Sequence, residues 1–204
     1  MFNKFLKDYF FDAFKDRKNE VQLEFIFSPD CNLACKYCYL NKYYNKQFPS
    51  ETFNPSKSIE NALKICQWLV DNDYAPGIDI FSGELFAQEC GFELLESLIN
   101  FYKKVPLEKR IPYINVPTNF TFLKSDELVK RMKKDLASLK ELNIYVNLSA
   151  SIDGKYMQEN RPYGKKLDLL NNDERDDEYY DKVFKFAKEY NFGFHPMIYS
   201  KNIK

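Results

Sequence analysis

Three cysteines that lie close together are the residues of this sequence best suited to bind a metal. Cys31, Cys35 and Cys38 fall within one stretch of eight residues, and Cys66 and Cys90 stand apart from them. Thiolates are ligands of both iron–sulfur clusters and zinc. Three local thiolates on a four-iron cluster would leave one iron open to a small molecule, and an open position distinguishes a reactive metal centre from a closed structural one. The spacing therefore indicates a metal site, with iron–sulfur chemistry as the first hypothesis.

The composition restricts what else the chain can do. Lys+Arg and Asp+Glu each number 30, so the formal net charge is zero and there is no general attraction to nucleic acid or to a membrane surface. No apolar run approaches the ~20 residues of a membrane-spanning helix. The first residues alternate apolar with charged side chains and lack the core of a signal peptide, so we expect a cytoplasmic protein. Five cysteines, an odd number, argue against a disulfide framework.

The cysteines follow the first of several segments that have a strand-like pattern. Strands are expected at residues 21–27, 78–82, 111–116, 144–152 and 192–198, with helical patterns between them. Ser56 or Ser58 is expected to cap the first of these helices, and Ser125 a later one. Strands that alternate with helices form parallel sheets, and ligands bind at the carboxyl ends of such strands. We therefore expect one α/β domain whose polar motifs, each just after a strand, meet at one edge of the sheet.

The C-x3-C-x2-C spacing, with the aromatic Tyr37 before the third cysteine, resembles the signature of the radical S-adenosylmethionine (SAM) superfamily. The resemblance extends over about residues 21–198 and implies a partial parallel (β/α) barrel, with about five βα units present. It implies a [4Fe–4S] cluster on Cys31, Cys35 and Cys38, with SAM on the open iron and Tyr37 beside it. In that family an electron from the cluster splits SAM into methionine and a 5′-deoxyadenosyl radical.

Two turns resemble SAM-binding turns of the same family. Ser82-Gly83-Glu84 is similar to a Gly-Gly-Glu-Pro turn that holds the methionine ammonium group of SAM, although Ser82 and Leu85 replace the first glycine and the proline. A glycine lets the backbone approach closely, and a carboxylate suits a cationic amine. Thr118-Asn119 is similar to a Thr-Asn pair that faces SAM. Taken alone, each segment is an ordinary polar turn.

The last two strands supply the remaining candidates. Ser149 to Asp153, with Arg161 further on, resembles the Ser-x-Asp-Gly motif and downstream arginine of peptide- and protein-modifying members, including anaerobic sulfatase-maturing enzymes. The resemblance implies that Ser149 and Ser151 contact SAM and that Arg161 binds its carboxylate, which a guanidinium is well shaped to do. Asp153 could organise the turn or lie near the substrate as the one candidate catalytic residue, and Arg161 could equally be an ion-pair partner. Ile198 is expected beneath the adenine.

We expect a helical segment over residues 1–20 and a radical SAM core domain over residues 21–204. The cysteine-rich C-terminal extension of sulfatase-maturing relatives does not occur, so we expect either a shortened form or a fragment of a longer reading frame. The resemblance also implies a peptide or protein substrate and an external electron donor of the flavodoxin or ferredoxin type. Neither nucleic acid nor a membrane is expected as a partner.

Two other classes of protein explain the cysteines with different chemistry. An iron–sulfur protein for electron transfer or sensing would need a fourth cluster ligand and would not bind SAM. A zinc-stabilised interaction module would also need a fourth ligand, for which His195, the single histidine, is the candidate. Cys66 lies on an apolar helix face and is expected to be a packing residue, and Cys90 is expected to start the next helix as a free thiol.

Overall fold

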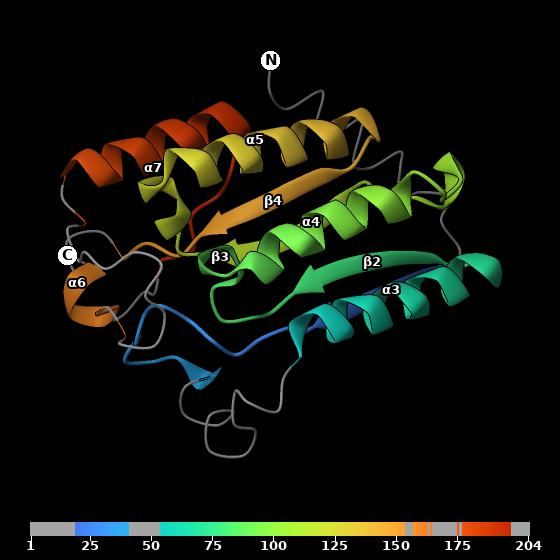
Figure 1. Ribbon diagram of the computed structural model, residues 1–204, viewed down its shortest axis with the longest axis horizontal. Helices are drawn as coiled ribbons and strands as arrows, with labels where there is room; N and C mark the ends of the chain where they lie inside the picture. The colour runs from blue at the N-terminus through green and yellow to red at the C-terminus, as the bar shows by residue number, and fades with distance from the viewer. Residues whose placement is uncertain are drawn as a thin grey trace.

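A computed structural model describes residues 19–40, 54–153, 157–162, 164, 175 and 177–196. Within these residues the protein is an α/β structure with a four-stranded parallel sheet in the order β1-β2-β3-β4 (Figure 1). The strands are β1 (Glu20–Phe25), β2 (Ala75–Ile80), β3 (Tyr113–Thr118) and β4 (Tyr145–Ala150). The helices are α3 (Pro55–Asp71), α4 (Glu89–Tyr102), α5 (Asp126–Glu141), α6 (Met157–Asn160) and α7 (Asp177–Tyr190). Each strand pairs with the next one along the chain, as the alternation of strands and helices predicts.

Four helices cover one face of the sheet. Figure 1 shows α3, α4, α5 and α7 on the same side of the strands. Val146 and Leu148 of β4 belong to the buried core on that side, whereas Asn147 between them is only partly buried. This alternation follows from the two-residue period of a strand. Burial of each large apolar side chain in this layer contributes about 1.5–3 kcal/mol to folding, so the sheet and its helices form a rigid support for the loops at its edge.

The helix caps agree with the sequence in one case and differ in another. Ser125 caps α5, with its hydroxyl oxygen 3.3 Å from the backbone nitrogen of Leu128, as expected. The cap of α3 is Asn54, whose Oδ1 accepts a hydrogen bond of 3.0 Å from Lys57, and not Ser56 or Ser58. Pro55 explains the correction, because proline favours the first position of a helix and makes the residue before it the cap. Ser56 instead donates a hydrogen bond of 2.7 Å to Glu93 on α4.

The fifth predicted strand is not a strand within the part of the chain that the structure describes. Phe194 forms a single isolated parallel bridge with Ala150, at the end of β4. The backbone nitrogen of Ala150 donates to Gly193, and that of His195 donates to Ala150. The sheet edge therefore continues by one residue pair, and a partial barrel remains compatible with the described sheet. Ile198 and most of the predicted segment 1–20 lie outside the described residues, and Glu20 belongs to β1.

The strand boundaries shift by a few residues from those expected. β2 begins at Ala75 and contains Gly77, and it ends before Ser82. The chain leaves the sheet there because the backbone nitrogen of Gly83 donates to Ser28 in the loop after β1. β3 ends at Thr118 rather than at Val116, so that this threonine is the last residue of the strand and Asn119 follows it.

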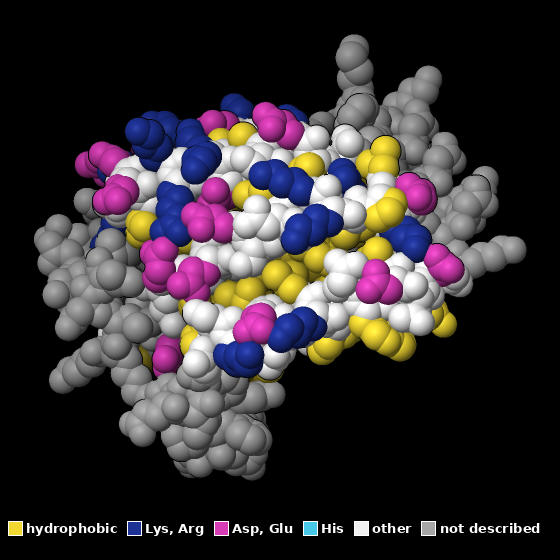
Figure 2. All heavy atoms as spheres, turned by 45° about the vertical axis from the view of Figure 1, so that its right-hand side comes forward, with side chains coloured by type: hydrophobic (Ala, Val, Ile, Leu, Met, Phe, Trp, Pro, Cys, Tyr) yellow, Lys and Arg dark blue, Asp and Glu magenta, His cyan; other side chains and the backbone are white. Residues whose placement is uncertain are grey.

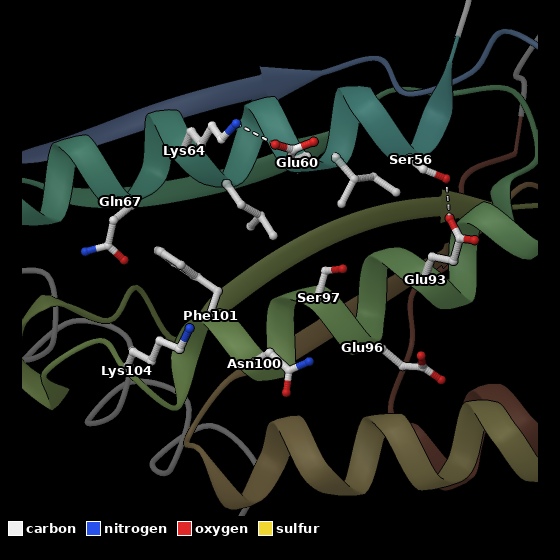
Figure 3. Close-up of a pocket in the computed structure, with 12 residues that line it drawn as sticks. Ser56, Glu60, Lys64, Gln67, Glu93, Glu96, Ser97, Asn100, Phe101 and Lys104 are labelled. Atoms are coloured by element: carbon white, nitrogen blue, oxygen red, sulfur yellow. Dashed lines mark hydrogen bonds and ion pairs between the residues drawn. The ribbon is translucent and has the colours of Figure 1, made fainter.

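A cleft of about 590 Å³ opens between α3 and α4 on the helical face. Figure 2 shows hydrophobic side chains exposed between rows of charged ones on the surface. In the close-up of Figure 3, Phe101 lies toward the cleft with Lys64 and Lys104 near one end and Glu93 near the other. No residue predicted for the metal or SAM site lines this cleft.

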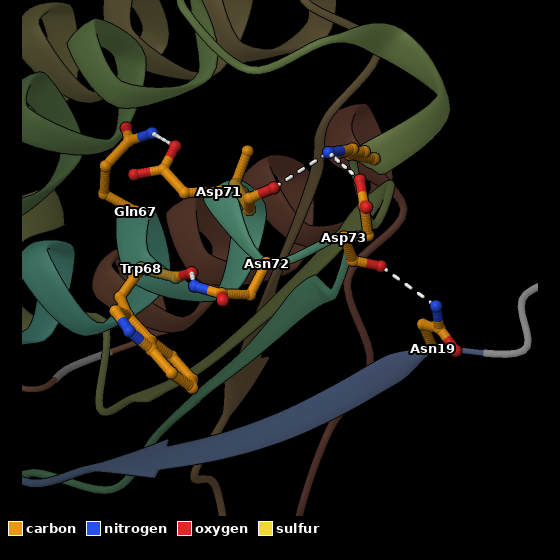
Figure 4. A network of polar contacts seen from close by, with 8 residues as sticks. Asn19, Gln67, Trp68, Asp71, Asn72 and Asp73 are labelled. Atoms are coloured by element: carbon orange, nitrogen blue, oxygen red, sulfur yellow. Dashed lines mark hydrogen bonds and ion pairs between the residues drawn. The ribbon is translucent and has the colours of Figure 1, made fainter.

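Polar contacts hold together the edge of the sheet at which the strands begin. The side chain of Asn19, just before β1, donates to the backbone oxygen of Asp73 at 3.1 Å (Figure 4). Lys109 donates to the carboxylate of Asp73 at 2.7 Å and to the backbone oxygen of Val70 at 2.8 Å. These contacts hold the amino ends of the strands, so the polar motifs after the carboxyl ends belong to the opposite edge.

None of the described helices is both long and apolar enough to cross a membrane.

Candidate metal centre

The three clustered cysteines lie in the loop that follows β1. Cys31, Cys35 and Cys38 are free and partly exposed. Cys66 is buried in the core, as expected of a packing residue, and Cys90 is a free thiol in the first turn of α4, as expected, but is also buried in the core. The backbone nitrogen of Cys38 donates to the backbone oxygen of Cys35 at 3.1 Å, which turns the chain between these two thiols. The backbone nitrogen of Leu33 donates to the sulfur of Cys31 at 3.4 Å. Hydrogen bonds of this kind stabilise a thiolate and influence the potential of a bound cluster.

A later segment of the chain runs along the cysteine loop and holds it by backbone hydrogen bonds. Ala34 donates to the backbone oxygen of Pro162 at 2.7 Å, and Lys36 donates to that of Asn160 at 2.9 Å. Gly164 in turn donates to the oxygen of Asn32 at 2.7 Å. We call Asn160–Pro162 together with Gly164 the strap. It satisfies backbone groups on both sides of Cys35 and so limits the positions this thiol can take.

The turn after β2 supports the same loop from the other side. The backbone nitrogen of Phe27 donates to the hydroxyl oxygen of Ser82 at 3.0 Å, and the backbone nitrogens of Gly83 and Glu84 donate to Ser28 and Asp30. A Cβ atom at Gly83 would lie 2.0 Å from the backbone oxygen of Asp30. Glycine is therefore required here because the backbone before the cysteines comes into direct contact with the turn.

Glu84 places a buried carboxylate between the ends of β2 and β3. Only 1% of the residue is exposed. Its carboxylate accepts hydrogen bonds from the hydroxyl of Thr118 at 2.8 Å and from the backbone nitrogens of Phe86 and Asn119. Burial raises the pKa of Glu84 to about 7, against the three donors, which favour the charged form and lower it. In this structure the carboxylate thus joins two strand ends.

A network of amides joins β3 to the cysteine loop. The side-chain nitrogen of Asn119 donates to the side-chain oxygen of Asn32 at 2.8 Å, and Asn32 donates to the hydroxyl of Thr121 at 2.7 Å. Asn119 also accepts from the backbone and the hydroxyl of Thr121, and all three residues are buried. The sequence analysis missed Asn32 and Thr121. The available signal was the position of Asn32 between Cys31 and Cys35, since a buried amide inside a ligand loop needs partners.

A buried ion pair lies on the side of the loop where the strap is. Nε and Nη2 of Arg161 donate to the two carboxylate oxygens of Asp153 at 2.9 and 3.1 Å. The hydroxyl of Tyr37 donates to the same carboxylate, and the guanidinium lies 5.1 Å from the centroid of the Tyr37 ring. Asp153 and Arg161 are 4% and 8% exposed. The structure thus joins three predicted site residues in one constellation, with Asp153 as the shared acceptor.

The surroundings of the thiols set their protonation. Burial raises the pKa of Cys31, and the nearby carboxylate of Glu84 raises it further, as do Cys35 and Cys38 to a smaller extent. Burial also raises the pKa of Cys35, but the charge of Arg161 and a hydrogen bond from it act in the opposite direction. Burial and the Asp153 carboxylate raise the pKa of Tyr37, so this phenol stays protonated as a donor. A bound metal ion would favour the thiolates, because coordination requires them deprotonated.

The two serines at the end of β4, Ser149 within the strand and Ser151 just after it, differ in their surroundings. The hydroxyl of Ser149 is fully buried and has no hydrogen-bond partner among the described residues. The backbone nitrogen of Ser151 donates to the oxygen of Thr118 at 3.0 Å, and its side chain is partly exposed. A buried hydroxyl without a partner costs about 1–3 kcal/mol. Ser149 is therefore a position at which a bound polar group would stabilise the protein.

The thiol loop fits an iron–sulfur cluster by the chemistry of its donors. It offers three free thiols on one short loop, and Cys31 is electrostatically coupled to the other two. Within the described ranges, no three histidine, cysteine or acidic side chains are grouped as a single metal ion requires. His195, the candidate fourth ligand for zinc, is exposed beside β4. Cys31, Cys35 and Cys38 are the residues that would hold a cluster, which would supply electrons to whatever binds beside it.

Fold and site together define an α/β protein with a metal centre at the carboxyl ends of its parallel strands. Residues 22–174 match the family model described as a 4Fe-4S single cluster domain. This match covers most of the chain, which therefore belongs to that family and is an iron–sulfur protein. No curated protein and no solved structure matches the chain.

Proposed function

We propose that this iron–sulfur protein is a radical SAM enzyme, with a single core domain over residues 21–204. The observation that carries the proposal is the convergence of polar residues that follow β2, β3 and β4 on the loop of three thiols that follows β1. Glu84 follows β2, Asn119 follows β3 and Asp153 follows β4, and each is joined to the loop or to its neighbours by hydrogen bonds. A structural cluster needs no such convergence, whereas a small molecule bound at the open edge of a parallel sheet does.

The candidate SAM contacts follow from the family resemblance and from the positions of these residues. The buried hydroxyl of Ser149 lacks a partner among the described residues, which supports a polar ligand at this point. The carboxylate of Glu84 is occupied by three donors and its carbonyl accepts from Gln88, so the carbonyl of Gly83 is the better candidate for the SAM ammonium group. The contacts that the resemblance implies are Tyr37, Ser82, Gly83, Glu84, Thr118, Asn119, Ser149, Ser151, Arg161 and Ile198, and of these Arg161 is already paired with Asp153.

Reduction of the bound cluster would supply the electron that cleaves SAM into methionine and a 5′-deoxyadenosyl radical. The chain's own residues would hold the ligand in place and keep water away from it. Asp153, which accepts hydrogen bonds from Tyr37 and Arg161, is the one candidate for a catalytic role. We further propose a peptide or protein side chain as the substrate, a flavodoxin- or ferredoxin-type electron donor and a cytoplasmic location.

The test is an anaerobic reconstitution with iron and sulfide, followed by reduction with dithionite. We expect an electron paramagnetic resonance (EPR) signal of a reduced [4Fe–4S] cluster that changes on addition of SAM, with 5′-deoxyadenosine formed. A cluster whose spectrum is the same with and without SAM would contradict the proposal and favour an electron-transfer or sensing protein. Zinc bound in place of iron after expression under iron-replete conditions would favour the interaction module.

A further inference from the structure

Arg161 lies opposite Cys35, because the strap sets the register between the two segments. The residues on either side of Cys35 donate backbone hydrogen bonds to the residues on either side of Arg161: Ala34 to Pro162, and Lys36 to Asn160. Two hydrogen bonds of 2.7 and 2.9 Å fix this alignment without any side chain. The guanidinium is thus brought to the middle thiol by backbone geometry, as cross-strand neighbours are in a sheet.

The guanidinium is also held in one orientation. Asp153 accepts from Nε and Nη2 in the two-pronged geometry that fixes an arginine most firmly. The Tyr37 ring lies against the guanidinium at 5.1 Å, and the Tyr37 hydroxyl donates to Asp153. We call Tyr37, Asp153 and Arg161 the clasp. Because Tyr37 lies directly before Cys38, the clasp is built partly from the cysteine loop itself. An arginine that serves as a mobile clamp for a ligand would not need two partners that fix its orientation.

We infer that Arg161 is a positioning residue of the metal centre: held by Asp153 and Tyr37, it directs its positive charge at Cys35 and raises the reduction potential of the bound cluster. Reduction adds one negative charge to the cluster and its thiolates. A positive charge in a mostly buried position stabilises the reduced form more than the oxidised form, and burial limits the screening of this effect. The carboxylate of Asp153 acts in the opposite direction and offsets part of the effect.

This inference differs from the role that the family resemblance gives Arg161. A SAM carboxylate would have to share the guanidinium with Asp153 or displace it from a bidentate pair. The inference rests on the cluster and not on the cleavage of SAM, so it can be tested in the absence of SAM.

The experiment is a potentiometric titration of the reconstituted full chain, followed by EPR without SAM, in wild type, Arg161→Gln and Asp153→Asn. We expect Arg161→Gln to lower the ratio of reduced to oxidised cluster at a fixed potential at least tenfold, which is about 59 mV for a one-electron couple. Asp153→Asn keeps an acceptor for Arg161 but removes the negative charge, so this ratio should rise several-fold. Shifts of the reduction potential in opposite directions in these two variants indicate an effect of charge. Structural damage would be expected to shift the potential in the same direction in both.

Arg131→Gln is the matched control. Arg131 also pairs with carboxylates, those of Glu89 and Glu96, and lies over an aromatic ring, that of Phe92. These partners lie on α4 and not on the cysteine loop, so the cluster of the Arg131→Gln protein should have the wild-type reduction potential. Iron and sulfide content is measured for every variant.

Each remaining outcome decides the question. An Arg161→Gln protein with a full cluster and the wild-type potential would overturn the inference. The same follows if its SAM affinity falls while the SAM-free potential is unchanged, since Arg161 would then serve the ligand. If Arg161→Gln fails to load iron, Arg161→Lys and Asp153→Asn carry the test, and an Asp153→Asn potential that falls or does not move overturns the inference. A wild-type cluster that ignores SAM would contradict the proposed function alone and leave this measurement intact.

Discussion

The side chain of Asn119, directly after β3, donates a hydrogen bond of 2.8 Å to the side chain of Asn32, which lies between the first two cysteines. This contact joins the middle of the sheet to the loop that would hold the cluster. The side-chain nitrogen of Asn32 in turn donates a hydrogen bond of 2.7 Å to the hydroxyl of Thr121. The position of Cys31 and Cys35 therefore depends on residues that bind no metal.

We expect Asn32→Ala to lower the free energy of unfolding by about 1–3 kcal/mol, because it leaves the buried side-chain nitrogen of Asn119 without its acceptor and removes the donor to the Thr121 hydroxyl. It should also lower the iron content after reconstitution, since the loop between the cysteines loses its support. Chemical denaturation of the metal-free chain and an iron assay measure the two effects. Asn100→Ala on the exposed side of α4 is the control and should change neither. Equal behaviour of the two variants would contradict a supporting role for Asn32.

Gly83→Ala should destabilise the protein by about 1–3 kcal/mol or more, because its Cβ would lie 2.0 Å from the backbone oxygen of Asp30 and backbone cannot move aside easily. A thermal melt of the metal-free chain measures the change. Gly193→Ala is a suitable control, since a Cβ there meets no atom within 4 Å. A melting temperature of Gly83→Ala equal to that of wild type would show that the turn and the cysteine loop are not packed as described.

The clustered cysteines should differ sharply from the buried ones in metal binding. Replacing Cys31, Cys35 or Cys38 by serine should abolish the cluster, because a serine hydroxyl stays protonated and is a poor ligand for iron. Cys90→Ser removes a thiol that packs in the core and should retain the cluster. Iron and acid-labile sulfide per chain after anaerobic reconstitution measure the outcome. Loss of iron from Cys90→Ser to the same extent as from Cys35→Ser would argue against the assignment of the ligands.

The stability of the metal-free chain should depend on pH through Glu84. Its pKa rises from 4.5 to about 7 on folding, so the folded state holds this proton more tightly than the unfolded state does. The stabilisation that Glu84 adds to the free energy of unfolding is fully present below pH 4.5. It is lost as the pH rises through 7, and the total loss is roughly 3 kcal/mol. Urea denaturation between pH 5 and 7.5 should show this decline in wild type and a flatter dependence in Glu84→Gln.

Glu60→Gln is the control for this measurement. Glu60 is exposed on α3, and its lysine neighbours Lys57 and Lys64 lower its pKa to about 2, below the range tested. Its replacement should leave the slope between pH 5 and 7.5 unchanged. If Glu84→Gln has the same slope as Glu60→Gln, another group is responsible for the pH dependence.

The sequence predicted the features that depend on local patterns. Alternating strands and helices indicated the parallel sheet, and Cys31, Cys35 and Cys38 indicated the metal loop, because spacing and periodicity are visible in the chain itself. The predicted cap of α3, Ser56 or Ser58, was wrong by two or four residues, since two serines and an asparagine compete there and Pro55 decides between them. Within the described residues the fifth predicted strand is reduced to one bridged pair, because an apolar pattern near Phe194 shows that a segment is buried or paired, not how many residues pair.

The rest of the site depends on contacts between distant segments. Nothing local to Arg161 tells whether it binds Asp153, a ligand or water, and nothing local to Asn32 indicates Asn119. The structure shows Arg161 and Glu84 with their charged groups engaged by the protein. Their predicted contacts with SAM remain predictions, and Ile198 lies outside the described residues. The resemblance was informative about where the candidate residues gather and uninformative about what each of them touches.

The clasp around the cysteine loop also has a consequence for how the protein is made. Tyr37 and its partner Asp153 are 116 residues apart. A ribosome adds about 5–20 residues per second, so on the order of ten seconds pass between synthesis of the three cysteines and completion of the strap. During that interval the thiols of the nascent chain lack their arginine and are open to oxidation by the surrounding medium. Insertion of iron is therefore expected late, when translation of the strap is complete, and oxygen exposure during synthesis should damage the centre more than the same exposure afterwards.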